Sequence, residues 1–131
     1  MLHPNQFHVN EAWIVFKLND APISAGSDGD FNLLALMDAA SCFILSTTTL
    51  AAGSDELSPL EAKRLLKKGQ SHKKQLPKKL FIPDVLLATQ LAVEAERLKI
   101  EVRRIAGAEL EVFIGEARES FKERFGRGST Q

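Results

Sequence analysis

The chain contains a single cysteine, Cys42, and no tyrosine. One cysteine cannot form an internal disulfide, so the disulfide-stapled class of small secreted proteins is excluded. Residues 1–6 lack the basic start and the apolar run of a secretory signal peptide. The most apolar stretch, residues 31–50, carries an asparagine, an aspartate, serines and threonines, too many polar side chains for a membrane span. We therefore predict a cytoplasmic protein without a membrane segment.

An excess of charge of either sign is also missing, because seventeen basic residues balance seventeen acidic ones. This zero net charge favours no class of partner. The 131 residues are 44% hydrophobic, which is enough for one ordinary core. We predict a single domain over residues 1–125 and a disordered tail over residues 126–131.

The charges are distributed unevenly along the chain. Residues 1–60 hold one basic and seven acidic residues, a net charge of −6, and residues 61–131 hold sixteen and ten, a net charge of +6. No acid lies between Glu61 and Asp84, an interval with eight basic residues: Lys63, Arg64, Lys67, Lys68, Lys73, Lys74, Lys78 and Lys79. One interpretation is a solvated helix and loop that face acidic residues of the same chain or of a second copy. The other is a nucleic-acid-binding patch, although no aromatic residue is interleaved in the run.

The first half of the chain is typical of an antiparallel sheet. Residues 12–18 end an apolar, β-branched and aromatic segment, which predicts a strand. Residues 21–23 are compatible with a second, very short strand. Residues 25–30 are rich in glycine and aspartate and predict a loop. Two further strands are expected at 31–37 and 42–50 around a turn at 38–41, which makes a hairpin. A helix over 31–41 is the open alternative.

The second half predicts helices and two short strands. Ser58, Pro59 and Glu61 have the spacing of a helix start, and Gly69 is expected to end that helix near residue 68. A basic linker to residue 79 and a strand at 80–82 follow. Asp84 is a candidate N-cap for a helix over 85–98, and a strand at 100–105 completes a βαβ unit with parallel strands.

A last helix follows Gly107. Its apolar residues lie on one stripe at helical spacing: Leu110, Phe113, Ile114, Ala117 and Phe121. The predicted fold class is α+β (mixed α/β): an antiparallel β-meander, then a βαβ unit and a C-terminal helix, with helices packed on a mixed sheet.

Two segments carry a resemblance to a known fold. Residues 33–45, which include Asp38, resemble the opening hairpin of ribonuclease-H-like proteins. Residues 76–84, the helix after them and residues 100–102 are similar to the second acidic strand and following helix of integrase cores. The same order of elements also resembles small bacterial domains of unknown function, which have no assigned activity.

The resemblance to nucleases implies a site for two metal ions. Asp38 and Asp84 would be its carboxylate ligands, and Glu116 or Glu119 would supply the third acid. The sequence departs from the integrase pattern, because no Asn-Gly follows Asp84. In addition, a single basic helix separates the hairpin from the strand at 80–82, so at least one core strand and much of the usual spacing are missing. The residues themselves favour a turn role for Asp38 and a helix cap for Asp84.

Other patterns give no catalytic or metal site. His3, His8 and His72 have no mutual metal-ligand spacing. Cys42 has acidic or neutral neighbours and is interpreted as a structural thiol. We expect no cofactor.

We therefore expect a non-enzymatic cytoplasmic interaction or regulatory domain that forms a homodimer, with a protein partner as a further option. Exposed aromatic residues would drive the association: Trp13, Phe16, Phe31 or Phe43. The alternative function is a nucleic-acid-binding domain or a metal-dependent nuclease that uses Asp38 and Asp84.

Overall fold

The computed structural model describes residues 2–19, 22–24, 26–54 and 56–129, which form one mixed sheet with three helices. The strands are β1 (Ala12–Lys17), β2 (Ile23–Ser24), β3 (Asp30–Asp38), β4 (Ile44–Ala51), β5 (Lys79–Pro83) and β6 (Glu101–Ile105). The helices are α1 (Pro59–Lys73), α2 (Thr89–Arg97) and α3 (Gly107–Ser129), with short 3-10 turns at Pro4–Gln6 and Gly26–Asp28. Among the described residues, no helix is long and apolar enough to cross a membrane.

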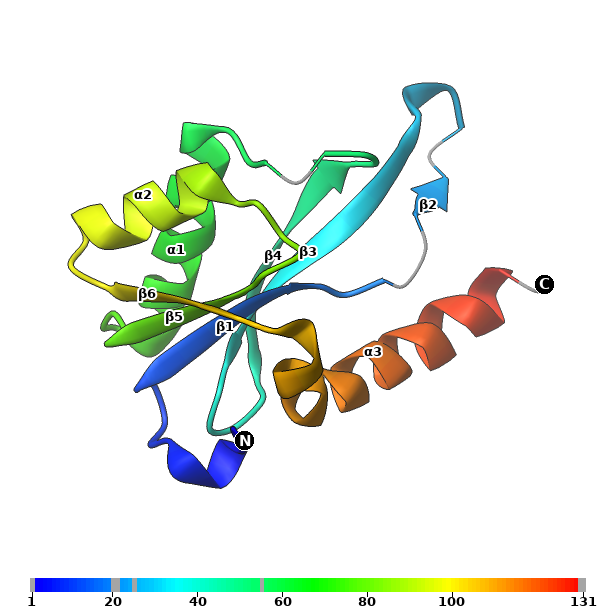
Figure 1. The fold of residues 1–131 in the computed structure, drawn as a ribbon. Coiled ribbons are helices and arrows are strands. Elements are labelled where there is room, and N and C mark those ends of the chain that lie inside the picture. Colours follow the sequence, from blue (N-terminus) through cyan, green and yellow to red (C-terminus); the bar gives the residue numbers. More distant parts are fainter. Residues whose placement is uncertain (1, 20–21, 25, 55, 130–131) are drawn as a thin grey trace.

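The strand order confirms the predicted fold class. β3 pairs antiparallel with β1 on one edge and with β4 on the other, and the short β2 extends the β1 edge. β5 joins β1 in parallel, and β6 joins β5 in parallel. The main order is therefore β4-β3-β1-β5-β6 (Figure 1). The hairpin over residues 31–50 forms as predicted, and the helical alternative for 31–41 is wrong.

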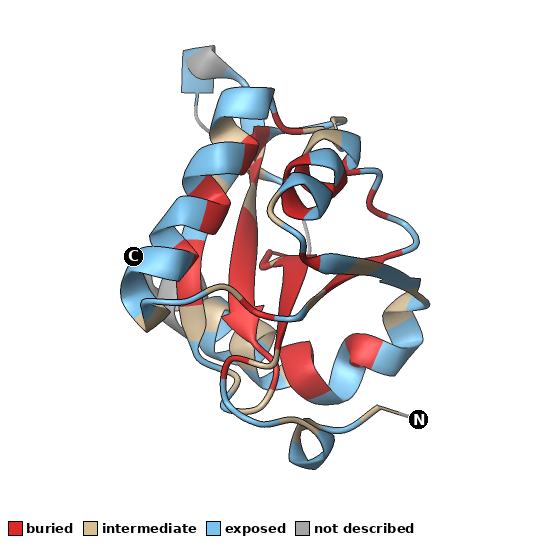
Figure 2. Cartoon of the chain, turned by 90° about the vertical axis from the view of Figure 1, so that its left-hand side faces the viewer, coloured by how far each residue is buried: buried red, intermediate tan, exposed pale blue. Residues whose placement is uncertain are grey.

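Helices cover both faces of the sheet. Alternate side chains of β1 point to opposite sides, so Trp13 and Val15 pack with α1 and α2, while Ile14 and Phe16 pack with α3. Figure 1 shows α1 and α2 on one side of the sheet and α3 on the other. The described sides of the helices that face the sheet are buried, and their outer sides are exposed (Figure 2). Trp13 and Phe16 are fully buried. They offer no surface for association, contrary to the expectation that these two aromatic residues are exposed.

The helix α1 begins as predicted and ends later. Ser58 Oγ accepts a hydrogen bond from the backbone N–H of Glu61 at 3.1 Å, which confirms the cap. Gly69 does not end the helix but lies inside it, against the sheet. A Cβ at this position would lie 2.9 Å from Leu36 Cδ2 and 3.0 Å from Trp13 ring carbons. The glycine therefore serves the close approach of α1 to the sheet.

The start of α2 corrects the role predicted for Asp84. The first helical residue is Thr89, and Asp84 lies in an exposed turn directly after β5. Ala88 stands at the N-cap position without a side-chain hydrogen bond. Glu56 replaces the cap from outside the helix, because its Oε1 accepts a hydrogen bond from the backbone N–H of Gln90 at 3.2 Å.

The helix α3 carries the predicted apolar stripe, which packs on the sheet face opposite α1. It continues to Ser129, past the position where we expected the tail to begin. Residues 130–131 of the predicted tail lie outside the described residues.

Candidate functional site

The carboxylate of Asp38 is hydrogen-bonded within and next to the turn between β3 and β4. Its side chain is fully buried. Oδ1 accepts a hydrogen bond from the backbone N–H of Asn10 at 2.6 Å, and Oδ2 accepts from the N–H and the hydroxyl of Ser41 at 2.9 and 2.7 Å. Three donors therefore satisfy this carboxylate, which ties the hairpin turn to the loop before β1.

Asp84 lies at the other end of the sheet. Trp13 is paired with Asp38 of β3 and with Leu80 of β5, so these three residues are level across the strands. Asp84 follows Leu80 by four residues, which is about 13 Å along the strand direction at 3.3 Å per residue. Two carboxylates so far apart cannot ligate the same pair of metal ions, which lie roughly 4 Å apart in two-metal sites.

Glu116 lies near the turn rather than near Asp84. It lines a surface pocket of about 580 Å³ with Ser41 and Cys42. The other candidate for the third acid, Glu119, is exposed on α3. Within the described residues, no group of three or more His, Cys, Asp or Glu side chains could hold a metal ion. The residues implied by the nuclease resemblance therefore do not fit a two-metal centre.

Cys42 is half-buried in the same turn, with its backbone in the left-handed conformation. Burial raises the pKa of its thiol, and the nearby carboxylates of Glu116 and Asp38 raise that pKa further. Both effects disfavour the reactive thiolate. The environment of Cys42 thus agrees with the structural thiol predicted from the sequence.

The exposed side of α1 gathers most of the basic run. The buried residues of this helix follow helical spacing: Ala62, Leu65, Leu66 and Gly69. The opposite side and the C-terminal end carry six basic residues, which we call the α1 basic surface: Lys63, Arg64, Lys67, Lys68, Lys73 and Lys74. All six except the half-buried Lys73 are exposed.

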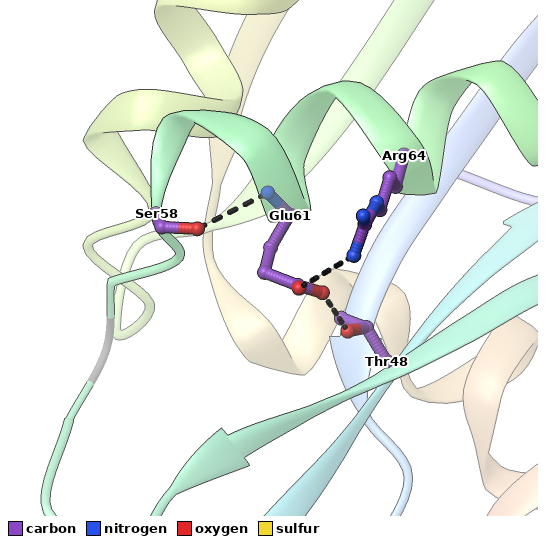
Figure 3. Close-up of polar contacts among 4 residues, drawn as sticks. All are labelled: Thr48, Ser58, Glu61 and Arg64. Atoms are coloured by element: carbon purple, nitrogen blue, oxygen red, sulfur yellow. Dashed lines mark hydrogen bonds and ion pairs between the residues drawn. The ribbon is translucent and has the colours of Figure 1, made fainter.

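The acidic residues that the structure describes leave most of this surface without an ion pair. Among the described residues, the ion pair of this surface is Arg64 with Glu61 on the same helix, at 3.5 Å. Glu61 is also held by Thr48 of β4, whose hydroxyl donates to Oε2 at 2.9 Å (Figure 3). Lys63 adds a longer-range attraction to Glu94 of α2. The described acids of residues 1–60 therefore form no ion pair with the α1 basic surface, and coverage by a second copy stays a prediction.

Lys78 and Lys79 lie apart from this surface, at the start of β5. Their backbone N–H groups both donate to the carbonyl oxygen of Glu11, at 2.9 and 3.2 Å. The eight basic residues of the sequence run are therefore split between α1 and the beginning of a strand.

An aromatic residue joins the basic surface from outside the run. Phe43, in the turn before β4, stacks on His72 of α1 with ring centroids 5.0 Å apart and planes 9° from parallel. Lys73 Nζ lies 5.8 Å from the centroid of the Phe43 ring, within the range of a cation–π contact. Phe43 remains 49% exposed. No local pattern of residues predicts this pair, because Phe43 and His72 belong to different elements of the fold.

A surface pocket of about 680 Å³ lies between β4 and the exposed side of α1. Its lining residues are Leu45, Arg64, Lys67, Lys68, Ser71 and His72. Three cationic side chains and one member of the Phe43–His72 stack therefore meet at one hollow. This arrangement can hold an anionic group beside a flat ring.

Comparison with known proteins finds similar structures but no similar sequence family. No family model matches the chain, and no curated protein matches it. The chain is similar to a chain of the cryo-EM structure of the simian T-cell lymphotropic virus intasome in complex with PP2A regulatory subunit B56 gamma, with a TM-score of 0.58 and 14% identity. That match covers 100% of this chain and 45% of the other, so the chain spans less than half of that length. The HTLV-2 integrase catalytic core, solved with magnesium, matches with a TM-score of 0.48 and 10% identity over 85% of this chain and 84% of its own.

These findings define the class of fold. The chain has the ribonuclease-H-like fold of retroviral integrase catalytic cores, without a sequence family. Between the hairpin and β5 the described residues form α1 and no further strand, and the central strand β1 precedes the hairpin.

Proposed function

We propose that this protein is a non-enzymatic cytoplasmic binding domain that contacts a polyanionic partner through the α1 basic surface. The observation that carries the proposal is the concentration of six basic side chains on one helix and its C-cap, in a chain with zero net charge and with one ion pair to a described acid. Such a local concentration of one sign attracts an oppositely charged partner and speeds its encounter.

The dispersal of the candidate acids supports a binding role over metal-dependent cleavage. Asp38 has its lone pairs occupied by the turn, and Asp84 lies at the far end of the sheet. A ribonuclease-H-like fold can host functions other than nuclease activity, because function depends on the site and not on the fold.

A heparin column tests the proposal. The wild-type protein should be retained at low salt and elute as salt rises, because exposed charges are screened. The double variant Lys67→Gln/Lys68→Gln should elute at clearly lower salt. A matched variant, Lys99→Gln/Arg103→Gln, removes two positive charges outside the α1 basic surface and should elute close to wild type. Equal elution of both variants would contradict the assignment to α1, and a metal-dependent nuclease activity of the pure protein would contradict the non-enzymatic role.

The homodimer is a separate proposal, on a different basis from the one given by the sequence. Trp13 and Phe16 are buried, Phe31 is half-buried and Phe43 is 49% exposed. In the part of the chain that the structure describes, the outer strands β4 and β6 each have one unpaired edge, which can pair with another chain. Charged residues on β6, including Glu101 and Arg103, oppose indiscriminate pairing at that edge.

A further inference from the structure

We propose that the polyanionic partner is a single-stranded nucleic acid, and that Phe43 and His72 form the platform on which one of its bases stacks. This inference rests on the proposed binding role of the α1 basic surface and names its partner. It is carried by the stacked ring pair, of which His72 also lines the cationic hollow and Phe43 lies on the side of the hairpin turn.

The chemistry of the platform favours a nucleic acid over an acidic protein segment. A polyanion without rings would bind through the basic side chains alone and would make no stacking contact with the exposed Phe43. Phe43 is 49% exposed although it stacks on His72 and lies near Lys73 Nζ, and we assign part of this exposed surface to a third flat group. Nucleobases stack on aromatic side chains regardless of sequence, because every base has a π-face.

The cations stand where the phosphates next to a stacked base must lie. His72 belongs both to the stack and to the lining of the pocket that also contains Arg64, Lys67 and Lys68. Lys73 lies against the Phe43 ring and adds charge at the platform itself. A strand can therefore place a base on the rings and its adjacent phosphates along α1.

The length of the surface sets the size of the contact. From Lys63 to Lys73 the helix rises about 15 Å at 1.5 Å per residue. At a spacing of about 3.4 Å per charge on one strand, this length matches roughly four phosphates. Release of their counterions predicts a slope of about −3 for log K against log salt, at 0.7 per phosphate of a single strand.

The preference for single strands follows from access to the base. In a duplex the bases are stacked and paired, so an exposed ring on a protein surface cannot reach a base face without unpairing it. The cations, in contrast, can bind the phosphates of either form. The platform should therefore add affinity for single strands alone.

The test measures binding of three probes: an oligothymidylate of about ten nucleotides, a duplex of the same length, and heparin. Wild type should bind the oligothymidylate at least about fivefold more tightly than the duplex, which is the fold-change for ~1 kcal/mol of stacking. Phe43→Leu keeps an apolar side chain and removes the ring. It should lose that preference while its affinity for duplex and heparin stays near wild type.

Two matched variants and a folding control separate the outcomes. Lys67→Gln/Lys68→Gln should weaken binding to all three probes, and Leu60→Ala, which shortens another exposed apolar residue of α1, should change none of them. Thermal unfolding checks that each variant is folded. Equal affinity of wild type and Phe43→Leu for the oligothymidylate would overturn the platform. Binding to heparin without binding to either nucleic acid would overturn the inference and leave the proposed function standing, whereas no binding to heparin would overturn both.

Discussion

The substitution Gly69→Ala tests the closest approach between α1 and the sheet. In an open helix this change stabilises by about 1 kcal/mol, because alanine is the better helix former. At Gly69 the new Cβ would lie 2.9 Å from Leu36 Cδ2 and 3.0 Å from two carbons of the Trp13 ring. Both side chains are fully buried, and the Trp13 indole N–H is fixed by a 2.7 Å hydrogen bond to Asn10 Oδ1. The ring therefore cannot move aside cheaply.

The expected magnitude follows from two opposed terms. Overpacking of this kind costs about 1–3 kcal/mol, and the helix preference returns about 1 kcal/mol. We expect Gly69→Ala to lower the free energy of unfolding by about 1–2 kcal/mol, since the contact involves a fixed ring.

A matched substitution in α3 provides the control. A Cβ at Gly115 would have nothing within 4 Å, so Gly115→Ala should stabilise by about 0.5–1 kcal/mol. Urea denaturation with an unchanged m-value measures both variants. If Gly69→Ala proved as stable as Gly115→Ala, the packing of α1 against Trp13 described above would be refuted.

Four further predictions follow from single residues and from the sheet edges. Ser58→Ala should cost about 1 kcal/mol in urea denaturation through loss of the cap on Glu61, and an unchanged midpoint would mean that the helix start is not held there. Asp38→Asn should cost about 1–3 kcal/mol because an amide nitrogen cannot accept the bonds made to the carboxylate, while Asp84→Asn, in an exposed turn, should change stability by less than about 0.5 kcal/mol. The raised pKa of Cys42 predicts slower alkylation by iodoacetamide at neutral pH than for free cysteine, with a rate that rises only at more alkaline pH, and a fast reaction at neutral pH would contradict it. Light scattering should detect a dimer that survives high salt if an outer strand pairs with a second copy, and a monomer at every salt concentration would remove the homodimer proposal.

Much of the fold can be predicted from short patterns of residues in the sequence. The hairpin around Asp38 and the parallel strands around α2 follow from β-branched runs, turn residues and helical spacing, which act over a few residues. The start of α1 was equally readable, because Ser58 meets its bonding partner Glu61 within one turn.

The predictions from sequence are wrong at positions whose role depends on a residue far away in the chain. Gly69 resembles a helix terminator until the Trp13 ring beside it is known. The position of Asp84 in the sequence is typical of a helix cap. The residue that caps α2 is instead Glu56, which is separated from α2 in the sequence by the whole of α1. The candidate site is still harder to predict from the sequence, because Phe43 contacts His72 only when the hairpin and α1 pack together. The basic residues could be predicted, and the ring pair beside them could not.

The most direct measurement is an NMR titration of the isotopically labelled protein with oligothymidylate in the presence of magnesium. Backbone amide shifts should change along the exposed side of α1 and around Phe43, while the amide shifts near Asp84 stay unchanged and the oligonucleotide stays intact. Shifts centred on Asp84 at the carboxyl end of β5, or cleavage of the oligonucleotide, would contradict this expectation.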